Sequence, residues 1–582
     1  MRPEDLGTYY ESILNKEVRR EGGVYYTPSL IVDYIVEHSV GELLKDKIPE
    51  DAAKIRIVDP ACGGGVFLLG AYQYLLDWHA KHTGKLTQTK RYKILTDNIF
   101  GVDIDPLAAE ITKYCLSMKC SENENIALNL DANIRVGNSL VDTEFNWQQE
   151  FSHVFKQGGF DIVIGNPPYV ESRSASVSAE LKMAYQNQVR LDFGDLSQYI
   201  TKGSDLLIYF FPRSITLLSE KGIGMLIVQN GWLNTDYGAK ASRFLIKTLQ
   251  QIKIIESPFR HFDRASANIN TVITQFRKQS EEKKINFDSM KKEGNKIVTQ
   301  QGKSFDLNNC ILPDMKWGMI LATDNEIFSI LTKVIEKGKT LNQTFYSIGQ
   351  GINVSKNAFI PKQEKQKFEQ KTNIIHAVFK EYQYTYSRFS YFLYHSFKPN
   401  QSDVSVLATI NAEAFGNGKF TRQYPSIIMP RGVGAVHFAG LLHGKALSNS
   451  FVDVYMNTQD EEKKLNIWLF CNSSVFFLYR ELSGRKNLGG GLLKSEAADI
   501  KQFPLYFPIA DRETILSIAG EMEKPVNLPD RLEESVQKKI DNLVFAYFGI
   551  KSAAQKKIVN ELLRLFRLRC EKAKIENNGL TK

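Results

Sequence analysis

The sequence predicts an α/β fold with a doubly wound sheet in its first half, followed by a mixed α+β region and a C-terminal helical segment. Three observations predict the first part. A short strand at 55–58 runs into a glycine-rich turn, Gly63 to Gly65, and an apolar helix from Val66, which is how a βαβ unit opens. A second strand-like segment ends at Asp103. A third, the apolar run 160–164, ends in Asn-Pro-Pro-Tyr.

The glycine-rich turn is neither G-x-G-x-x-G nor G-x-x-x-x-G-K-[ST], so it is neither a dinucleotide fingerprint nor a phosphate loop. Its glycines allow the backbone to approach a ligand closely, and Asp59 can hold a cationic or amino group. Asp103 is placed to accept hydrogen bonds from the hydroxyls of a ribose, although a solvated loop acid is the alternative. The two acids are 44 residues apart, against about 20 in a compact unit. The helix and the polar stretch 81–93 must fill the difference.

Asn166 to Tyr169 suit the alkylation of an exocyclic amino group, whose lone pair is delocalised into its ring. The Asn166 carbonyl oxygen and a fixed main-chain carbonyl can each accept one amino hydrogen, so that the nitrogen moves toward tetrahedral geometry. Pro167 and Pro168 have a fixed φ and no N–H, and Tyr169 offers a flat face for a planar substrate. A plain strand terminator is the alternative for the two prolines.

The composition limits the class of protein. At 582 residues the chain is expected to form two or three domains. Its hydrophobic and charged fractions, 43% and 24%, are those of a soluble globular protein, and no signal peptide or bilayer-spanning run is recognised. Six cysteines without C-x-x-C spacing argue against a zinc site and suit a reducing cytosol. The net charge of +9 permits a phosphate-binding face.

The order YYTP, DPACGGGVF, GVDID, RVGNSL, IGNPPY resembles the Eco57I/TaqI-type class of DNA adenine-N6 methyltransferases, over residues 8 to 277. The resemblance implies a Rossmann-like S-adenosylmethionine-dependent methyltransferase domain and transfer of a methyl group to a flipped adenine in double-stranded DNA. A cytosine-C5 methyltransferase is disfavoured because the Pro-Cys dipeptide is absent. No metal is expected.

The resemblance also implies roles for single residues. Tyr26, Thr27 and Pro28 resemble the segment that closes over the methionine end of the cofactor, although Thr27 as helix N-cap and Pro28 as first helical residue would also explain them. The other residues implied to contact the cofactor are Asp59, Ala61, Gly63, Asp103, Ile104, Asn138 and Asn166. At Asn138 the family usually has an aspartate, and an amide oxygen can still accept the adenine amino hydrogen.

Two aromatic side chains are implied to hold the target base. Asn166 to Tyr169 resemble the catalytic loop, in which Asn166 and the Pro167 carbonyl accept from the amino group. Tyr169 would stack on one face of the extruded base and Phe262 on the other. A small hydrophobic plug is the alternative for Phe262. The segment 205–233 predicts a further helix, a stop at Gly222 and a buried strand.

The second half of the sequence resembles, more loosely, the DNA target-recognition domain found at the C-terminus of this methyltransferase class. The polar stretch 278–305 is expected to be the domain boundary, although a pair of exposed strands would fit it equally. Arg485, Lys486 and Lys494 flank a glycine loop with the chemistry for phosphate contact, and Arg431 suits a phosphate or a guanine edge. A solvated surface role is the alternative for each.

The C-terminal segment is strongly helical. Leu543, Val544, Tyr547 and Phe548 recur at helical spacing and are expected to pack in a core. The cluster Arg564, Arg567, Arg569 and Lys572 would lie along DNA or face solvent.

The expected layout is therefore a cofactor-binding and catalytic domain at 1–280, a target-recognition domain at 300–527 and a helical segment at 528–582. The short stretch before Tyr-Tyr-Thr-Pro leaves no room for a nuclease domain, so a stand-alone modification enzyme is expected. It is also expected to be monomeric, cytoplasmic and associated with DNA. It would be an orphan or the partner of a separately encoded restriction enzyme. Two alternatives stay open: another amide or amino nitrogen as substrate, in a protein glutamine or an RNA base, and a modification subunit that needs a separate specificity protein.

Overall fold

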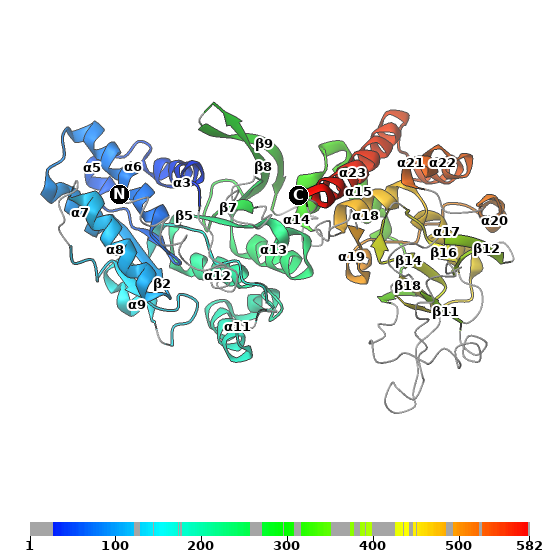
Figure 1. Cartoon of the computed structure of the whole chain (residues 1–582), viewed down its shortest axis with the longest axis horizontal. Coiled ribbons are helices and arrows are strands. Elements are labelled where there is room, and N and C mark those ends of the chain that lie inside the picture. Colours follow the sequence, from blue (N-terminus) through cyan, green and yellow to red (C-terminus); the bar gives the residue numbers. More distant parts are fainter. Residues whose placement is uncertain are drawn as a thin grey trace. The chain divides into compact units, whose positions relative to one another are not determined.

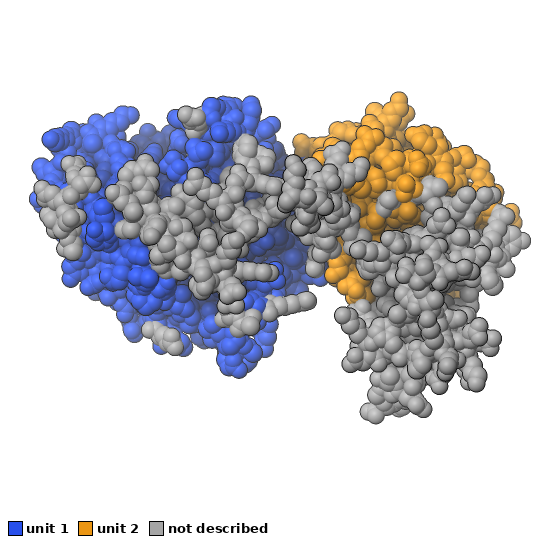
Figure 2. Space-filling model, in the orientation of Figure 1, with its two compact units in different colours: residues 1–321 blue, residues 322–582 orange. Residues whose placement is uncertain are grey.

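The structure is a computed structural model, and it divides into two compact units, Met1–Leu321 and Ala322–Lys582 (Figure 1, Figure 2). We treat each unit by itself. The residues that the structure describes are 27–121, 128–143, 145–172, 174, 177–256, 271–294, 296–307, 316–350, 373–376, 384–389, 392–397, 425–434, 436–441, 446–449, 451–484, 493–522 and 527–579.

The first unit is an α/β structure around a mixed sheet (Figure 1). The described residues give this sheet nine strands in the order β3-β2-β1-β4-β5-β7-β6-β8-β9. Strands β3, β2, β1, β4 and β5 are parallel, and β7 lies antiparallel between β5 and β6. Strands covered on both faces have nearly continuous apolar sequences, as the buried run of β4 does. The strands are β1 (Ile57–Asp59), β2 (Ile99–Asp103), β3 (Ile134–Val136), β4 (Phe160–Gly165), β5 (Leu218–Gln229), β6 (Gln251–Glu256), β7 (Thr271–Arg277), β8 (Lys284–Glu293) and β9 (Lys296–Asp306).

Helices cover this sheet. Helices α3, α6, α7 and α8 contribute buried apolar side chains to one core with β1, β2, β4 and β5, while α11 and α13 both pack on α12, which in turn packs on β4 and β5. The helical elements are α3 (Ser29–Val36), the π-helical η1 (Glu37–Gly41), α4 (Glu42–Leu44), α5 (Pro49–Ala52), α6 (Val66–Thr83), α7 (Gln88–Asn98), α8 (Pro106–Cys120), α9 (Trp147–Glu150), α10 (Ser152–Phe155), α11 (Ala179–Phe193), η2 (Gly194–Tyr199), α12 (Leu206–Leu217), η3 (Asn230–Asn234), α13 (Asp236–Thr248) and α14 (Trp317–Ala322).

The long spacing between Asp59 and Asp103 has a simple cause. Two helices, α6 and α7, lie between β1 and β2 instead of one. Most of the polar stretch 81–93 belongs to them, because α7 begins at Gln88 with Thr87 as its N-cap. The second helix therefore accounts for the extra residues, and β1 and β2 still pair directly.

The prediction that Gly222 stops a helix is wrong. Helix α12 ends at Leu217 and β5 begins at once, so Gly222 lies inside the strand. The pairing of β4 with β5 shifts register between Phe160 and Ile162. A Cβ on Gly222 would lie 3.0 Å from the carbonyl oxygens of Phe160 and of Asp161. The glycine is thus needed for close backbone approach at this irregularity.

The segment 278–305 is not a domain boundary. It forms most of β8 and β9, which extend the sheet of the first unit, and this unit continues to Leu321. The alternative of two strands was the correct one. Strand β8 buries Ile285, Phe287 and Met290, whereas β9 is mostly exposed. An outer strand that faces solvent carries the polar composition that resembled a linker.

The second unit has a four-stranded antiparallel sheet, in the order β10-β18-β14-β16, and three two-stranded pairs, β11 with β17, β12 with β13 and β15 with β19 (Figure 1). Its strands are β10 (Tyr346–Gln350), β11 (Asn373–His376), β12 (Tyr384–Phe389), β13 (Phe392–Phe397), β14 (Ile427–Pro430), β15 (Gly432–Val433), β16 (Gly440–Leu441), β17 (Ala446–Asn449), β18 (Phe451–Met456) and β19 (Leu493–Lys494). Its helices are α15 (Asn325–Lys339), α17 (Glu461–Cys471), α18 (Ser474–Ser483), α19 (Ala497–Lys501), α20 (Arg512–Glu521), α21 (Leu528–Glu533), α22 (Ser535–Phe548) and α23 (Ser552–Gly579).

The C-terminal helices are part of this unit and not a separate segment. Helix α23 packs on α15, α18 and α21. The predicted packing of the α22 stripe is confirmed for Val544, which is buried, and for Phe548, whose ring contacts Phe470 and Phe507. Leu543, Tyr547 and Phe548 are half-buried. The prediction for Arg569 is wrong: this side chain is 3% exposed and pairs with Glu481 inside the unit. Among the described helices, none has the length and apolarity that crossing a membrane requires.

Candidate active site

The polar residues predicted for the site lie at one edge of the sheet in the first unit. Strand β1 pairs in parallel with β2 on one side and with β4 on the other. Parallel neighbours end at the same edge, and the strand order diverges at β1, where ligands of open α/β sheets bind. Asp59, Asp103 and Asn166, at the ends of these three strands, therefore share this edge.

Asp103 and the glycine-rich turn form one hydrogen-bonded unit. The Gly63 N–H donates to Asp103 Oδ2 over 2.8 Å, and the Cys62 N–H donates to the Val102 carbonyl over 3.0 Å. From α8, the Thr112 hydroxyl donates to the Gly63 carbonyl over 2.7 Å. Gly65 has a φ of +83°, and a Cβ there would lie 2.8 Å from Thr112 Oγ1. The turn thus needs glycine at this position to pack against α8, and the predicted close approach of a ligand stays a prediction.

Asp59 is buried under this turn, at 1% exposure. Its Oδ1 accepts a hydrogen bond from the Ala61 N–H over 2.9 Å. Burial raises the pKa of Asp59 to about 8, with a smaller contribution from the charge of Asp103, and burial also raises the pKa of Asp103. Two carboxyl groups held in this way favour a ligand that brings hydrogen-bond donors or positive charge.

Apolar side chains adjoin Asp103 on the open side of the sheet. Ile104, the next residue, is 67% exposed, and Val136, which pairs with Asp103 across β2 and β3, is 44% exposed. Asn138 follows β3, and its Oδ1 accepts from the Leu140 N–H over 3.1 Å. An amide oxygen has a second lone pair, so this bond is compatible with the acceptor role predicted for Asn138.

The end of β4 touches Asp59. A Cβ on Gly165 would lie 2.5 Å from Asp59 Oδ1, so only glycine fits at this position. Asn166 follows directly, and its Nδ2 donates to the hydroxyl oxygen of Thr27 over 3.1 Å. Because the amide nitrogen faces Thr27, the amide oxygen is directed the other way.

This contact changes the interpretation of Thr27. Helix α3 begins at Ser29 with Pro28 as its N-cap, and no side chain caps it. The alternative explanation, Thr27 as N-cap and Pro28 as the first helical residue, is therefore wrong by one position. Thr27 is 1% exposed, and its hydroxyl contacts the catalytic-loop candidate instead.

The loop after Asn166 is held at its far end by a residue that sequence reasoning missed. The Ser172 N–H donates to Asp205 Oδ1 over 2.8 Å, and the Tyr237 hydroxyl donates to Asp205 Oδ2. The Leu206 N–H donates to the Val170 carbonyl over 3.0 Å. Asp205 directly precedes α12, a position from which an aspartate usually caps its own helix, but here it makes no such cap.

Tyr169 lies between Asn166, which contacts Thr27, and Ser172, which contacts Asp205, and it is 7% exposed. The ring face that the sequence assigned to a stacked base is thus buried in this structure. Phe262, the predicted partner for the other face, and Tyr26 lie outside the described residues. So do Arg485 and Lys486, two of the predicted DNA contacts.

The other two predicted DNA contacts, Arg431 and Lys494, lie together in the second unit. Both pair with Glu496, which the sequence did not single out: Arg431 Nε is 2.7 Å from Glu496 Oε2, and Lys494 Nζ is 2.9 Å from Oε1. The only signal for Glu496 was its place two residues after Lys494. Among the described residues, no cluster of histidine, cysteine and acidic side chains is suited to a metal ion.

Residues 97–262 match the family described as Eco57I restriction-modification methylase. This part of the chain is similar to Eco57I-type methyltransferases. It includes the ends of β2 and β4, with Asp103 and the Asn-Pro-Pro-Tyr loop.

Relatives with this segment are named as methyltransferases. The restriction enzyme and methyltransferase RM.Eco57I of Escherichia coli is 29% identical over 286 residues, which are 44% of this chain and 28% of the relative. The adenine-specific methyltransferase PglX of Streptomyces coelicolor is 22% identical over 211 residues, 31% of this chain and 17% of the relative. The chain thus matches less than a third of the length of either.

One solved structure has a similar fold over nearly the whole chain. The type IIL restriction-modification enzyme MmeI, solved in complex with DNA, matches with a TM-score of 0.55 and 15% identity. The match covers 98% of this chain and 82% of that one. At this identity the likeness concerns the fold.

Asp59→Asn is expected to flatten the pH dependence of stability. A group with a raised folded pKa contributes stability that is present below its unfolded pKa, about 3.9, and is lost as the pH rises through the folded value, which is about 8 for Asp59. Between these values the free energy of unfolding of the wild type should fall relative to that of the variant, by an amount on the order of several kcal/mol.

Urea titrations of both proteins across this pH range measure the difference. Asparagine keeps an oxygen that can accept from the Ala61 N–H, so the fold of the turn is retained. A difference between the two proteins that stays constant with pH would show that Asp59 is already ionised in the folded chain.

Proposed function

We propose that this chain transfers a methyl group from S-adenosylmethionine to the N6 amino group of an adenine in double-stranded DNA. One observation carries the proposal: Asn166 directly follows Gly165, which lies against the buried Asp59 at the carboxyl end of β4, and the Asn166 amide nitrogen donates to Thr27. The relatives named as methyltransferases support the reaction class, and the name of PglX supports adenine.

The difficulty of the reaction lies in the amino nitrogen, whose lone pair is delocalised into the purine ring. A pair of acceptors for its two hydrogens removes that delocalisation by turning the nitrogen toward tetrahedral geometry. The Asn166 amide oxygen is one acceptor, and its direction follows from the bond between Nδ2 and Thr27. The Pro167 carbonyl is the other, because the two prolines restrict the backbone of the loop. Acceptors placed in advance lower the barrier mainly by orientation.

The residues at the edge of the sheet fit S-adenosylmethionine. Its amino group and ribose hydroxyls are hydrogen-bond donors, and the buried carboxyl groups of Asp59 and Asp103 would accept hydrogen bonds from them. Gly63 and Gly65 leave the turn without side chains, and the exposed Ile104 would cover the flat adenine ring. When bound there, the cofactor supplies an electrophilic methyl group.

DNA is proposed as the substrate because the second unit carries paired basic side chains, Arg431 and Lys494, and because the chain has a net charge of +9. A paired adenine cannot reach a site at the edge of a sheet, so the base must leave the helix, at the expense of a few kcal/mol of stacking. Tyr169 and Phe262 would hold it. Since Tyr169 is 7% exposed, we expect its ring to become accessible only when DNA binds.

Asn166→Ala is expected to reduce methyl transfer by about 100-fold or more, the effect of removing one positioned hydrogen-bonding group from a transition state. Transfer of tritiated methyl groups from S-adenosylmethionine to plasmid DNA measures the rate, and calorimetry measures cofactor binding, which should remain. Asn129→Ala, at an exposed asparagine of the same unit, is the control. A variant at Asn166 with the turnover of the wild type would remove this residue from the mechanism.

Thr27→Val is expected to lower turnover about 10-fold, because it deletes a hydrogen bond worth about 1 kcal/mol or slightly more that orients the Asn166 amide. Thr27→Ser keeps the hydroxyl and should stay near the wild type. Steady-state kinetics separate the effects on kcat and on KM for the cofactor. If Thr27→Val changed only KM, the threonine would serve cofactor binding and not the orientation of Asn166.

A further inference from the structure

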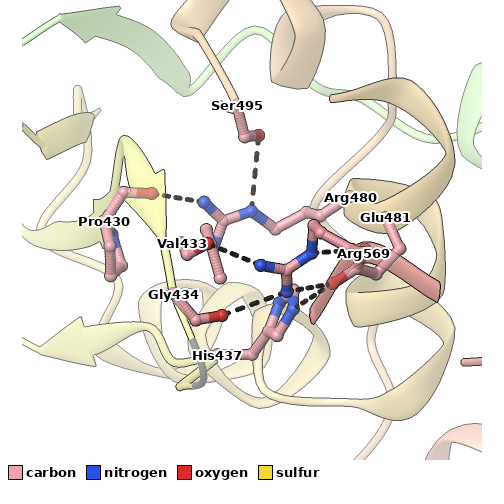
Figure 3. A network of polar contacts seen from close by, with 8 residues as sticks. All are labelled: Pro430, Val433, Gly434, His437, Arg480, Glu481, Ser495 and Arg569. Carbon is pink, nitrogen blue, oxygen red and sulfur yellow. Dashed lines mark hydrogen bonds and ion pairs between the residues drawn. The ribbon is translucent and has the colours of Figure 1, made fainter. Parts of the chain in front are cut away.

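A short segment of the second unit, residues 430–434, is held by two arginine side chains. The Arg480 guanidinium donates to the Pro430 carbonyl. Arg569, from the distant helix α23, donates to the Val433 and Gly434 carbonyls over 3.1 and 3.0 Å. Figure 3 shows the two guanidinium groups directed at this segment.

The arginines are themselves fixed by a buried network (Figure 3). Arg480 is fully buried, and so is Glu481 beside it on α18. Glu481 accepts from Arg569 over 2.7 Å and lies 2.9 Å from His437 Nε2. Burial alone would raise the pKa of Glu481, but His437 and Arg569 lower it to about 2.

Such a network is a poor source of stability. Well-packed apolar side chains in place of a buried ion pair are often neutral or stabilising, because desolvation of the charges opposes their attraction. The network instead fixes the backbone of 430–434, because its two arginines donate hydrogen bonds to main-chain carbonyls of this segment. The Ser495 N–H also donates to the Arg431 carbonyl, over 2.8 Å.

The segment so fixed is one strand of a two-stranded antiparallel ribbon. Strand β15 pairs with β19, with Gly432 opposite Lys494 and Val433 opposite Leu493. Arg431 directly precedes β15, and Lys494 ends β19. A two-stranded ribbon is one of the elements that the DNA major groove admits.

The side chain of Arg431 is oriented as firmly as its backbone. Its Nε and Nη2 both donate to the carboxylate of Glu496, over 2.7 and 2.9 Å, in a two-point contact. Glu496 in turn begins α19 in a capping box with Asp499. The amide of Gln350 lies against Nη1. Of the five N–H groups of a guanidinium, these described contacts leave one on each terminal nitrogen.

Two donors in a fixed plane match the N7 and O6 acceptors of guanine, the commonest specific contact of arginine in the major groove. A backbone phosphate is a poorer match. It needs no fixed plane of donors. Lys494, a flexible point charge 30% exposed, suits a phosphate better.

We propose that Arg431 reads a guanine in the recognition sequence, oriented by Glu496 on a ribbon that Arg480 and Arg569 hold in place. The proposal rests on the proposed function, since it assumes that the chain modifies DNA at a specific sequence. It adds a base-reading residue and a positioning residue to the second unit.

The test begins with the wild type, whose methylated motif is read from the genome of an expressing host. Duplexes with this motif, and with each of its G·C pairs replaced in turn, are then compared in binding and methylation. Arg431→Ala and Arg431→Lys should lose the preference for guanine at one position by roughly 5- to 100-fold, the discrimination of one two-point contact. Arg431→Lys keeps the charge, so its salt dependence should match the wild type.

Lys494→Ala is the matched control on the same ribbon. It should weaken binding to all duplexes alike and reduce the slope of log K against log salt by about one. Glu496→Gln, which keeps one acceptor for Arg431 without the charge, should lose part of the preference at the same position as the Arg431 variants.

Two results would overturn the inference. If Arg431→Ala behaved like Lys494→Ala, with every preference kept and a reduced salt slope, Arg431 would be a phosphate contact. If the Arg431 variants behaved like the wild type in both respects, Arg431 would not touch DNA. In either case the wild type would still methylate its motif, so the proposed function would stand. A wild type without activity on DNA would instead overturn the proposed function.

Discussion

The first unit depends on the contact between the ends of β1 and β4. Gly165 comes so close to Asp59 that a Cβ on the glycine would lie 2.5 Å from the Asp59 carboxylate. The buried Asp59 also accepts a hydrogen bond from the Ala61 N–H and so holds the glycine-rich turn. Asn166 follows Gly165 directly and contacts Thr27. The glycine-rich turn, the Asn-Pro-Pro-Tyr loop and Thr27 thus meet at two neighbouring strand ends. A change in any of the three would move the other two, because protein interiors are close-packed.

In the second unit, buried charged side chains fix the position of a backbone segment. The segment 430–434 begins at the last residue of β14, and its strand β15 pairs with β19 over two residues, so no long ladder fixes it. Buried arginines from α18 and α23 hold that segment by its carbonyls. The C-terminal helix is therefore needed for the geometry of a loop far away in sequence, which explains why one of its arginines is buried.

Local patterns in the sequence predicted the parallel part of the sheet and the residues at its edge. The apolar run before Asn166 and the glycines after Asp59 are signals that lie within a few residues of what they predict. The features that were missed depend on distant contacts. Thr27 resembled a helix cap because its partner lies 139 residues away, and Asp205 gave no local sign of what it binds. Glu496 lies two residues from Lys494, but its other partner, Arg431, is 65 residues away. Strand β9 resembled a linker because an outer strand facing solvent is polar. The roles of Phe262, Tyr26, Arg485 and Lys486 stay predictions.

Methylation of adenine in DNA is tested most directly in a host that has no DNA methylation of its own. The chain is expressed there, and the genome is read by single-molecule sequencing, with a host that expresses Asn166→Ala as the reference. We expect N6-methyladenine at one recurring motif in the first genome and none in the second. An unmodified genome, from folded protein that binds S-adenosylmethionine, would contradict methylation of DNA by this chain alone and would point to a separate specificity protein or to another substrate.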